Sequence, residues 1–189
     1  MSAPTYDPGP SPAFLERGGH GPAPAAGEDR RAWIQGLLEQ VVDPEIPVLT
    51  IADMGILKGV DLAPDGAVTV RITPTYSGCP AMDMIAAEVR RTLADAGIES
   101  VTVDQVLSPA WTTDWMTDEG REKLRAYGIA PPAKGAGKRS LMGMDDPEVA
   151  CPQCGSTQTE KVSEFGSTAC KALWRCTACL EPFDYFKCI

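Results

Sequence analysis

Two Cys-x2-Cys pairs near the end of the chain constrain its fold more than any other feature. Cys151 and Cys154 form the first pair, and Cys176 and Cys179 form the second, after the 21 residues 155–175. Four thiolates arranged in two such pairs can converge tetrahedrally on one metal ion, and the segment between them is long enough for a β-hairpin. The sequence therefore predicts a zinc β-ribbon over residues 151–189.

The identity of the metal stays open between two alternatives. Closed four-cysteine sites in small ribbons generally supply folding energy, which favours structural zinc. The same four thiolates could hold iron, as in a rubredoxin-type site. In either case so short a segment cannot build a sufficient apolar core, so we expect the metal to be a condition of its folding. Four aromatic residues exceed what this core needs, and they either complete the ribbon or pack against the first domain or a partner: Trp174, Phe183, Tyr185 and Phe186.

The charge and the N-terminal sequence exclude several classes of protein. The formal net charge is -9, so the chain as a whole would repel the phosphates of nucleic acid and anionic lipid. Residues 1–14 lack the basic segment and apolar run of a signal peptide, and no apolar stretch has the length of a membrane span. We expect a cytoplasmic protein with no nucleic-acid or membrane partner. In that reducing compartment, seven cysteines argue against a disulfide framework.

Hydrophobic periodicity divides the chain into four parts. Residues 1–27 are rich in Pro and Gly and predict a disordered tail, and residues 129–150 predict a linker. Between them, residues 28–128 predict the order helix, strand, strand, helix, strand, helix. The first helix should run from residue 28 to Asp43, and the second should follow Pro80 and end near Gly97. This order predicts an α+β fold, a two-layer domain with its helices on one face of a small sheet.

The histidine content excludes much catalytic chemistry. The one histidine of the chain, His20, lies in the predicted tail. A Ser-His-Asp or Cys-His site needs an imidazole, and a ferritin-like di-iron oxygenase needs two Glu-x-x-His motifs on long helices. No Gly-x-Gly-x-x-Gly segment offers a seat for a flavin or a nicotinamide. A thiol enzyme would have to pair Cys79 with a carboxylate such as Asp53 or Asp83, without histidine.

Cys79 lies between Gly78 and Pro80, where a strand should give way to a helix. We expect it at or beside the N-cap, with its thiol facing unpaired backbone N–H groups that lower its pKa. Asp83 should oppose this effect and leave a modest depression. The alternative is a small buried residue that fills the junction. The roles of Cys170 and Cys188 are also open, since each could be a small buried residue, a substitute metal ligand or a redox thiol.

Two stretches of the first domain resemble a known family. "DPEIPVLTIADMGILKGV" and "TPTYSGCPAMDMI" are similar to the SufT-like family of iron-sulfur cluster assembly proteins. The matching motifs are Asp43-Pro44-Glu45, Asp53-x-Gly55 and Gly78-Cys79-Pro80. Together with "STACKALWRCTACLEPFDYFKC", residues 30 to 189 resemble the PaaD family (also called PaaJ), whose members belong to the phenylacetyl-CoA epoxidase, or phenylacetate-CoA oxygenase.

This resemblance implies a role that composition does not show. Such a protein would be a non-catalytic accessory subunit in aerobic phenylacetate degradation that assists assembly of iron-sulfur or iron centres. Its partners would be the other epoxidase subunits, with the iron-sulfur reductase as a client. Cys79 would be the thiol that meets a transient iron-sulfur cluster or a client, and the cluster would need further ligands from a second chain, a free thiol or the client. The alternative is a rubredoxin-like electron carrier that uses the four-cysteine site.

Overall fold

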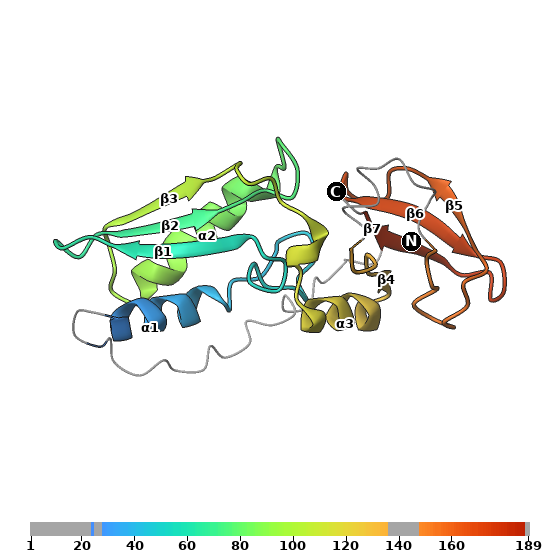
Figure 1. Cartoon of the computed structure of the whole chain (residues 1–189), viewed down its shortest axis with the longest axis horizontal. Helices are drawn as coiled ribbons and strands as arrows, with labels where there is room; N and C mark the ends of the chain where they lie inside the picture. Colours follow the sequence, from blue (N-terminus) through green and yellow to red (C-terminus); the bar gives the residue numbers. More distant parts are fainter. Residues whose placement is uncertain (1–23, 25–27, 136–147, 188–189) are drawn as a thin grey trace, which may run out of the picture.

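The computed structural model describes residue 24 and residues 28–135 and 148–187, and it shows two small β-sheets at opposite ends of an elongated molecule (Figure 1). His20 and the predicted tail other than residue 24, the middle of the predicted linker and Cys188 lie outside the described residues. In the part that is described, no helix is both long and apolar enough to span a membrane.

The first sheet has three strands in the order β1-β2-β3. β1 (Leu57–Leu62) and β2 (Val68–Ile72) form an antiparallel hairpin, whose turn is held by the Asp65 carboxylate accepting from Ala67 N at 3.0 Å. β3 (Val101–Gln105) pairs with β2 in parallel. A parallel pair needs a crossover connection, and α2 (Ala81–Asp95) provides it.

Two helices, α1 (Glu28–Leu38) and α2, cover one face of this sheet (Figure 1). Their apolar residues recur at helical spacing, those of β2 alternate, and the two sets meet in one core. The members of this core with at most 1% exposure include Ile34, Leu38, Val68, Val70, Ile72, Ile85, Val89 and Leu93. The predicted α+β class is therefore confirmed, as is the order of elements, with α3 (Asp118–Tyr127) as the last helix.

The first helix is shorter than the sequence predicted, because it ends at Leu38 and not at Asp43. The chain after it turns back on itself, with Val42 bridging Thr50 and Asp43 N donating to Leu49 O at 2.8 Å. These contacts bury Ile46 and Leu49 almost completely. The Asp-Pro-Glu segment is thus a structured part of the core and not merely a helix stop.

The second sheet is the predicted ribbon with one additional strand. β5 (Thr159–Ser163), β6 (Lys171–Cys176) and β7 (Pro182–Phe186) are antiparallel neighbours. β4 (Ile129–Ala130) pairs in parallel with the outer edge of β7. Gly128 ends α3 with a positive φ of 91°, which directs the next two residues onto this edge. The start of the predicted linker is therefore part of the ribbon sheet.

The aromatic residues of the ribbon divide between two cores. Trp174, Phe183 and Tyr185 lie in a small core with the metal-site cysteines Cys151 and Cys176. Phe186 belongs instead to the core of the first domain and is fully buried. Its ring meets Trp111 edge-on at a centroid distance of 6.2 Å, and the Trp111 indole donates to Met54 O at 2.9 Å. Phe186 thereby anchors the ribbon to the first domain.

We expect Phe186→Ala to destabilise the first domain by about 3 to 5 kcal/mol, because it leaves a cavity in that domain's core. Denaturant unfolding followed by the helical circular-dichroism signal measures this, since all described helices lie before the ribbon. Phe165→Ala is the matched control, because the Phe165 side chain is 65% exposed. An unchanged helical transition in Phe186→Ala would contradict the anchoring role.

Candidate functional site

The four paired cysteines converge at one end of the ribbon. Their sulfur atoms all lie within 4.8 Å of one another. The Sγ atoms of Cys151 and Cys179 are 3.8 Å apart, and those of Cys154 and Cys176 are 3.6 Å apart. Tetrahedral coordination at a metal–sulfur distance of about 2.3 Å requires sulfur atoms about 3.8 Å apart, so the group has the geometry to hold one ion.

The backbone of the ribbon favours ionisation of one of these thiols, that of Cys176. Cys179 N donates to the Cys176 sulfur at 3.4 Å. This hydrogen bond is the largest influence that lowers the pKa of Cys176 to about 7, so a thiolate is accessible there near neutral pH. Gly155, with a φ of 75°, closes the first pair by donating its N–H to Cys151 O at 2.9 Å. An ion held here would use all four thiols as ligands, which is typical of a structural site.

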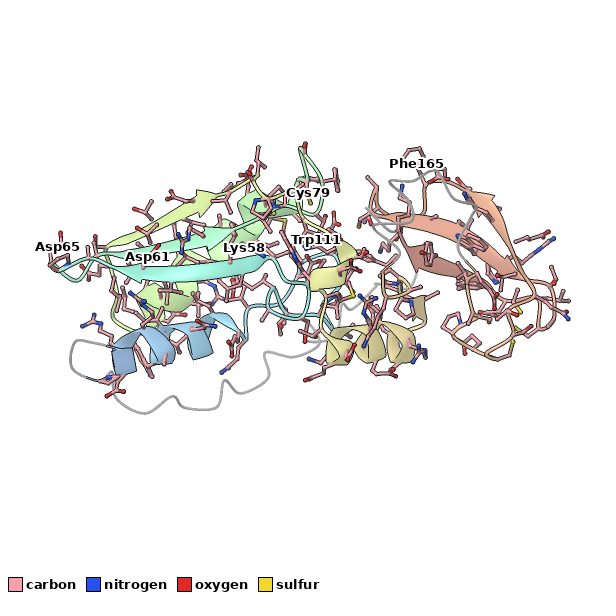
Figure 2. All side chains as sticks on the ribbon, viewed as in Figure 1. Lys58, Asp61, Asp65, Cys79, Trp111 and Phe165 are labelled. Carbon is pink, nitrogen blue, oxygen red and sulfur yellow. The ribbon has the colours of Figure 1, made fainter. Side chains whose placement is uncertain are left out.

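Cys79 lies at the end of the first sheet that faces the ribbon, opposite the hairpin tip at Asp65 (Figure 2). Gly78, with a φ of 83°, turns the chain, and α2 begins at Ala81 with Pro80 as its N-cap. Cys79 thus immediately precedes the cap, as the sequence predicted, and its side chain is half-buried.

The predicted depression of the Cys79 pKa is wrong. Burial, the largest influence, raises the pKa of this thiol above its ordinary value, and the carboxylates of Glu45 and Asp43 raise it further. The N–H of Ala81 and a hydrogen bond from the Tyr76 hydroxyl lower it, but they do not outweigh the other effects. The sequence suggested the helix end and could not show that two carboxylates face the thiol. Asp83, the acid expected to act here, is exposed on α2.

A small cavity joins Cys79 to residues that sequence reasoning did not connect with it. Its lining includes Asp43 and Glu45 from the segment after α1, and Cys170 from the ribbon. The Cys170 sulfur lies 3.9 Å from Glu45 Oε2 and 3.0 Å from the Thr168 hydroxyl. The Asp-Pro-Glu motif was the available signal for the carboxylates. No pattern in the sequence pointed to Cys170 as their neighbour.

Asp53 has a structural role that keeps it away from Cys79. Its Oδ2 accepts from Lys123 Nζ at 2.8 Å and from Thr50 N at 3.0 Å, which ties the segment before β1 to α3. Gly55 follows with a φ of 66°, and a Cβ there would lie 2.7 Å from the Cβ of Trp115. The Asp53-x-Gly55 motif therefore fixes a tight turn. Neither Asp53 nor Asp83 lines the cavity beside Cys79.

The two halves of the chain match two sequence families. Residues 31–106 match the family described as "Iron-sulfur cluster assembly protein", and residues 136–187 match the "PaaD zinc beta ribbon domain". A protein of Escherichia coli (strain K12), provisionally named as a subunit of 1,2-phenylacetyl-CoA epoxidase, is 53% identical over 156 residues. This alignment covers 82% of this chain and 92% of that protein.

Two further relatives match the first domain alone, and both are named as Fe-S protein maturation auxiliary factors. The protein from Porphyromonas gingivalis is 39% identical over 89 residues, covering 47% of this chain and 84% of its own length. The protein YitW of Bacillus subtilis is 41% identical over 85 residues, covering 44% of this chain and 82% of its own length.

We expect Cys176→Ser to lose the metal ion of the four-cysteine site and to unfold the ribbon, because three thiolates and a small core cannot replace the fourth ligand. Elemental analysis of the purified protein counts the ion, and cobalt substitution reports tetrahedral thiolate ligation by its visible absorption. Cys79→Ser is the control and should keep a full equivalent. A wild-type protein with less than about half an equivalent of zinc plus iron would refute the site.

The pH dependence of stability should reveal the contribution of Asp53. Burial alone would raise the pKa of its carboxyl, but the hydrogen bonds from Lys123 and Thr50 hold it below its ordinary value. A group with a depressed folded pKa stabilises the fold above its unfolded pKa, and this stability is lost as the pH falls through the folded pKa.

We therefore expect Asp53→Asn to cost about 1 to 3 kcal/mol at pH 7 and progressively less as the pH falls below the ordinary range of an aspartate. Thermal unfolding of the helical signal across this range measures the difference. Asp61→Asn removes an exposed pair with Arg71 at 3.2 Å and should change stability by at most about 0.5 kcal/mol. A pH-independent cost for Asp53→Asn would show that the charge is not involved.

Proposed function

The chain belongs to the PaaD family of phenylacetyl-CoA epoxidase subunits, and on this basis we propose that it is a non-catalytic accessory protein that helps assemble the iron-sulfur or iron centres of that enzyme system. The observation that carries this proposal is the pairing, in one chain, of an iron-sulfur assembly domain with the PaaD-type ribbon. The relatives of the first domain alone are named as maturation factors for iron-sulfur proteins, which supports the same role.

The four-cysteine site would hold zinc and serve as a structural element. Its sulfur–sulfur distances suit a closed tetrahedral site, and zinc has neither redox chemistry nor a geometric preference that would disturb one. The ion would fold the ribbon and so place β7, with Phe186, against the first domain. In this role the ribbon sets the shape of the protein and does not transfer electrons.

Cys79 would be the thiol that meets the iron or the iron-sulfur cargo. It lies half-buried at the end of the first domain that faces the ribbon, and its raised pKa keeps it a neutral thiol in the resting protein. Coordination by a metal deprotonates a thiol outright, so the thiol would become a ligand when cargo arrives. The clients would be other subunits of the epoxidase, with the iron-sulfur reductase as a candidate.

A second candidate function, rubredoxin-like electron transfer, is favoured by one observation, since four thiolates at these distances also suit iron. The metal content separates the two functions. Iron in the four-cysteine site would colour the purified protein red and give a reversible one-electron couple. Colourless protein with one tightly held zinc supports the assembly role.

We expect Cys79→Ser to fold and keep its ribbon metal but to abolish growth on phenylacetate in a strain whose own gene for this protein is deleted. Phenylacetyl-CoA consumption in extracts should fall with it, together with the iron content of the epoxidase subunits. Ser77→Ala, an exposed change in the same loop, is the control and should restore growth. Normal growth with abundant, folded Cys79→Ser protein would show that the thiol is only a spacer.

A further inference from the structure

Two thiols outside the four-cysteine site line one cavity, although they belong to different domains. Cys79 precedes α2 in the first domain, and Cys170 precedes β6 in the ribbon. Cys170 is buried and lies in the core of the first domain together with Phe186. Cys170 therefore lines the same cavity as Cys79 because the ribbon packs against the first domain.

A carboxylate completes this group. Glu45 Oε2 lies 3.9 Å from the Cys170 sulfur, and Glu45 lines the same cavity. Its position is fixed by Asp43, whose Oδ1 accepts from Glu45 N and Ile46 N, each at 2.8 Å. Asp43 thereby positions the turn that carries Glu45, and the Glu45 carboxylate contacts the Cys170 thiol.

The charges around the cavity favour a cation. Two carboxylates and two thiols line it together with Thr75 and five apolar side chains. A nearby cation, Lys171, is largely buried and pairs with Asp184 at 3.7 Å. Burial, and after it the carboxylate of Glu45, raise the pKa of both thiols. A divalent ion between the sulfur atoms would offset this repulsion and stabilise the thiolates.

The cavity has room for a small guest. Its volume is about 10 Å³, close to the room that one water molecule needs. Two thiolates with one carboxylate suit the thiophilic divalent cations, Fe²⁺ and Zn²⁺ among them. Among the residues described, the donors that already lie within 4.8 Å of one another are those of the four-cysteine group. The donor atoms of Cys79, Cys170 and Glu45 are spread more widely than this, so their side chains must close around an ion to bind it.

We infer that Cys79, Cys170 and Glu45 form a second metal site, at the junction of the two domains, that takes one thiophilic divalent cation. Each thiol releases its proton to solvent and forms one sulfur–metal bond, and a Glu45 oxygen provides the third ligand. The choice of Fe²⁺ as the cargo rests on the proposed function. In this arrangement the chain itself supplies the additional ligands that Cys79 needs.

Anaerobic titration of the full-length protein with Fe²⁺, after its four-cysteine site has been filled with zinc, tests the inference. Equilibrium dialysis should find one further equivalent bound to the wild type. Cys170→Ser and Glu45→Gln should each weaken this binding about 10-fold or more, since even residues behind the ligands have effects of that size. Glu164→Gln is the matched control, an exposed carboxylate of the same ribbon, and should leave binding unchanged.

Alkylation of the wild type decides the matter if a variant fails to fold. One equivalent of Fe²⁺ should protect both Cys79 and Cys170, read by mass spectrometry of their peptides. Protection of Cys79 alone, or undiminished Fe²⁺ uptake by Cys170→Ser, overturns the junction site and leaves the proposed function standing. Growth supported by Cys79→Ser, with junction binding intact in the wild type, rejects the proposed role of Cys79 in assembly and retains the site.

Discussion

The convergence of four thiolates on one point is the interaction on which the rest of this structure depends. The ribbon has a small core of its own, and one of its largest side chains, Phe186, is buried in the neighbouring domain instead. Without cross-linking by an ion, so short a sheet would lack the apolar burial to hold its strands in register. An ion held by the four cysteines would therefore fix β6 and β7, and through them the part of the ribbon that packs against the Cys79 end of the first domain.

The sequence predicted the secondary-structure elements better than it predicted the contacts between the two domains. Local patterns were sufficient for the hairpin at Asp65, for the helix that follows Pro80 and for the pairing of four cysteines, because each depends on residues close in the chain. The proximity of Cys170 to Glu45 depends instead on how two domains dock. That docking includes the burial of Phe186 against Trp111, a contact with no periodic signature.

The Cys79 thiol shows how an environment can reverse a local rule. A helix N-terminus lowers a thiol pKa, and the N–H of Ala81 does act in that direction. Burial, joined by two carboxylates from a segment far earlier in the chain, raises the pKa by more. The motif alone predicted a modestly lowered pKa for the Cys79 thiol, and its surroundings raise that pKa instead. The same carboxylates that discourage a free thiolate would favour a metal thiolate.

The position of β4 has a consequence for the way this protein can be divided. Ile129 and Ala130 precede the sequence that matches the ribbon family, yet they cover the outer edge of β7. A ribbon excised at the family boundary would carry away a sheet with an open edge, ready to recruit a strand from another molecule. The first domain would keep the strand that belongs on that edge. A hybrid built by exchanging ribbons between relatives must therefore include β4 with the ribbon. The hydrogen-bonded sheet begins at Ile129, before residue 136, where the match to the ribbon family begins.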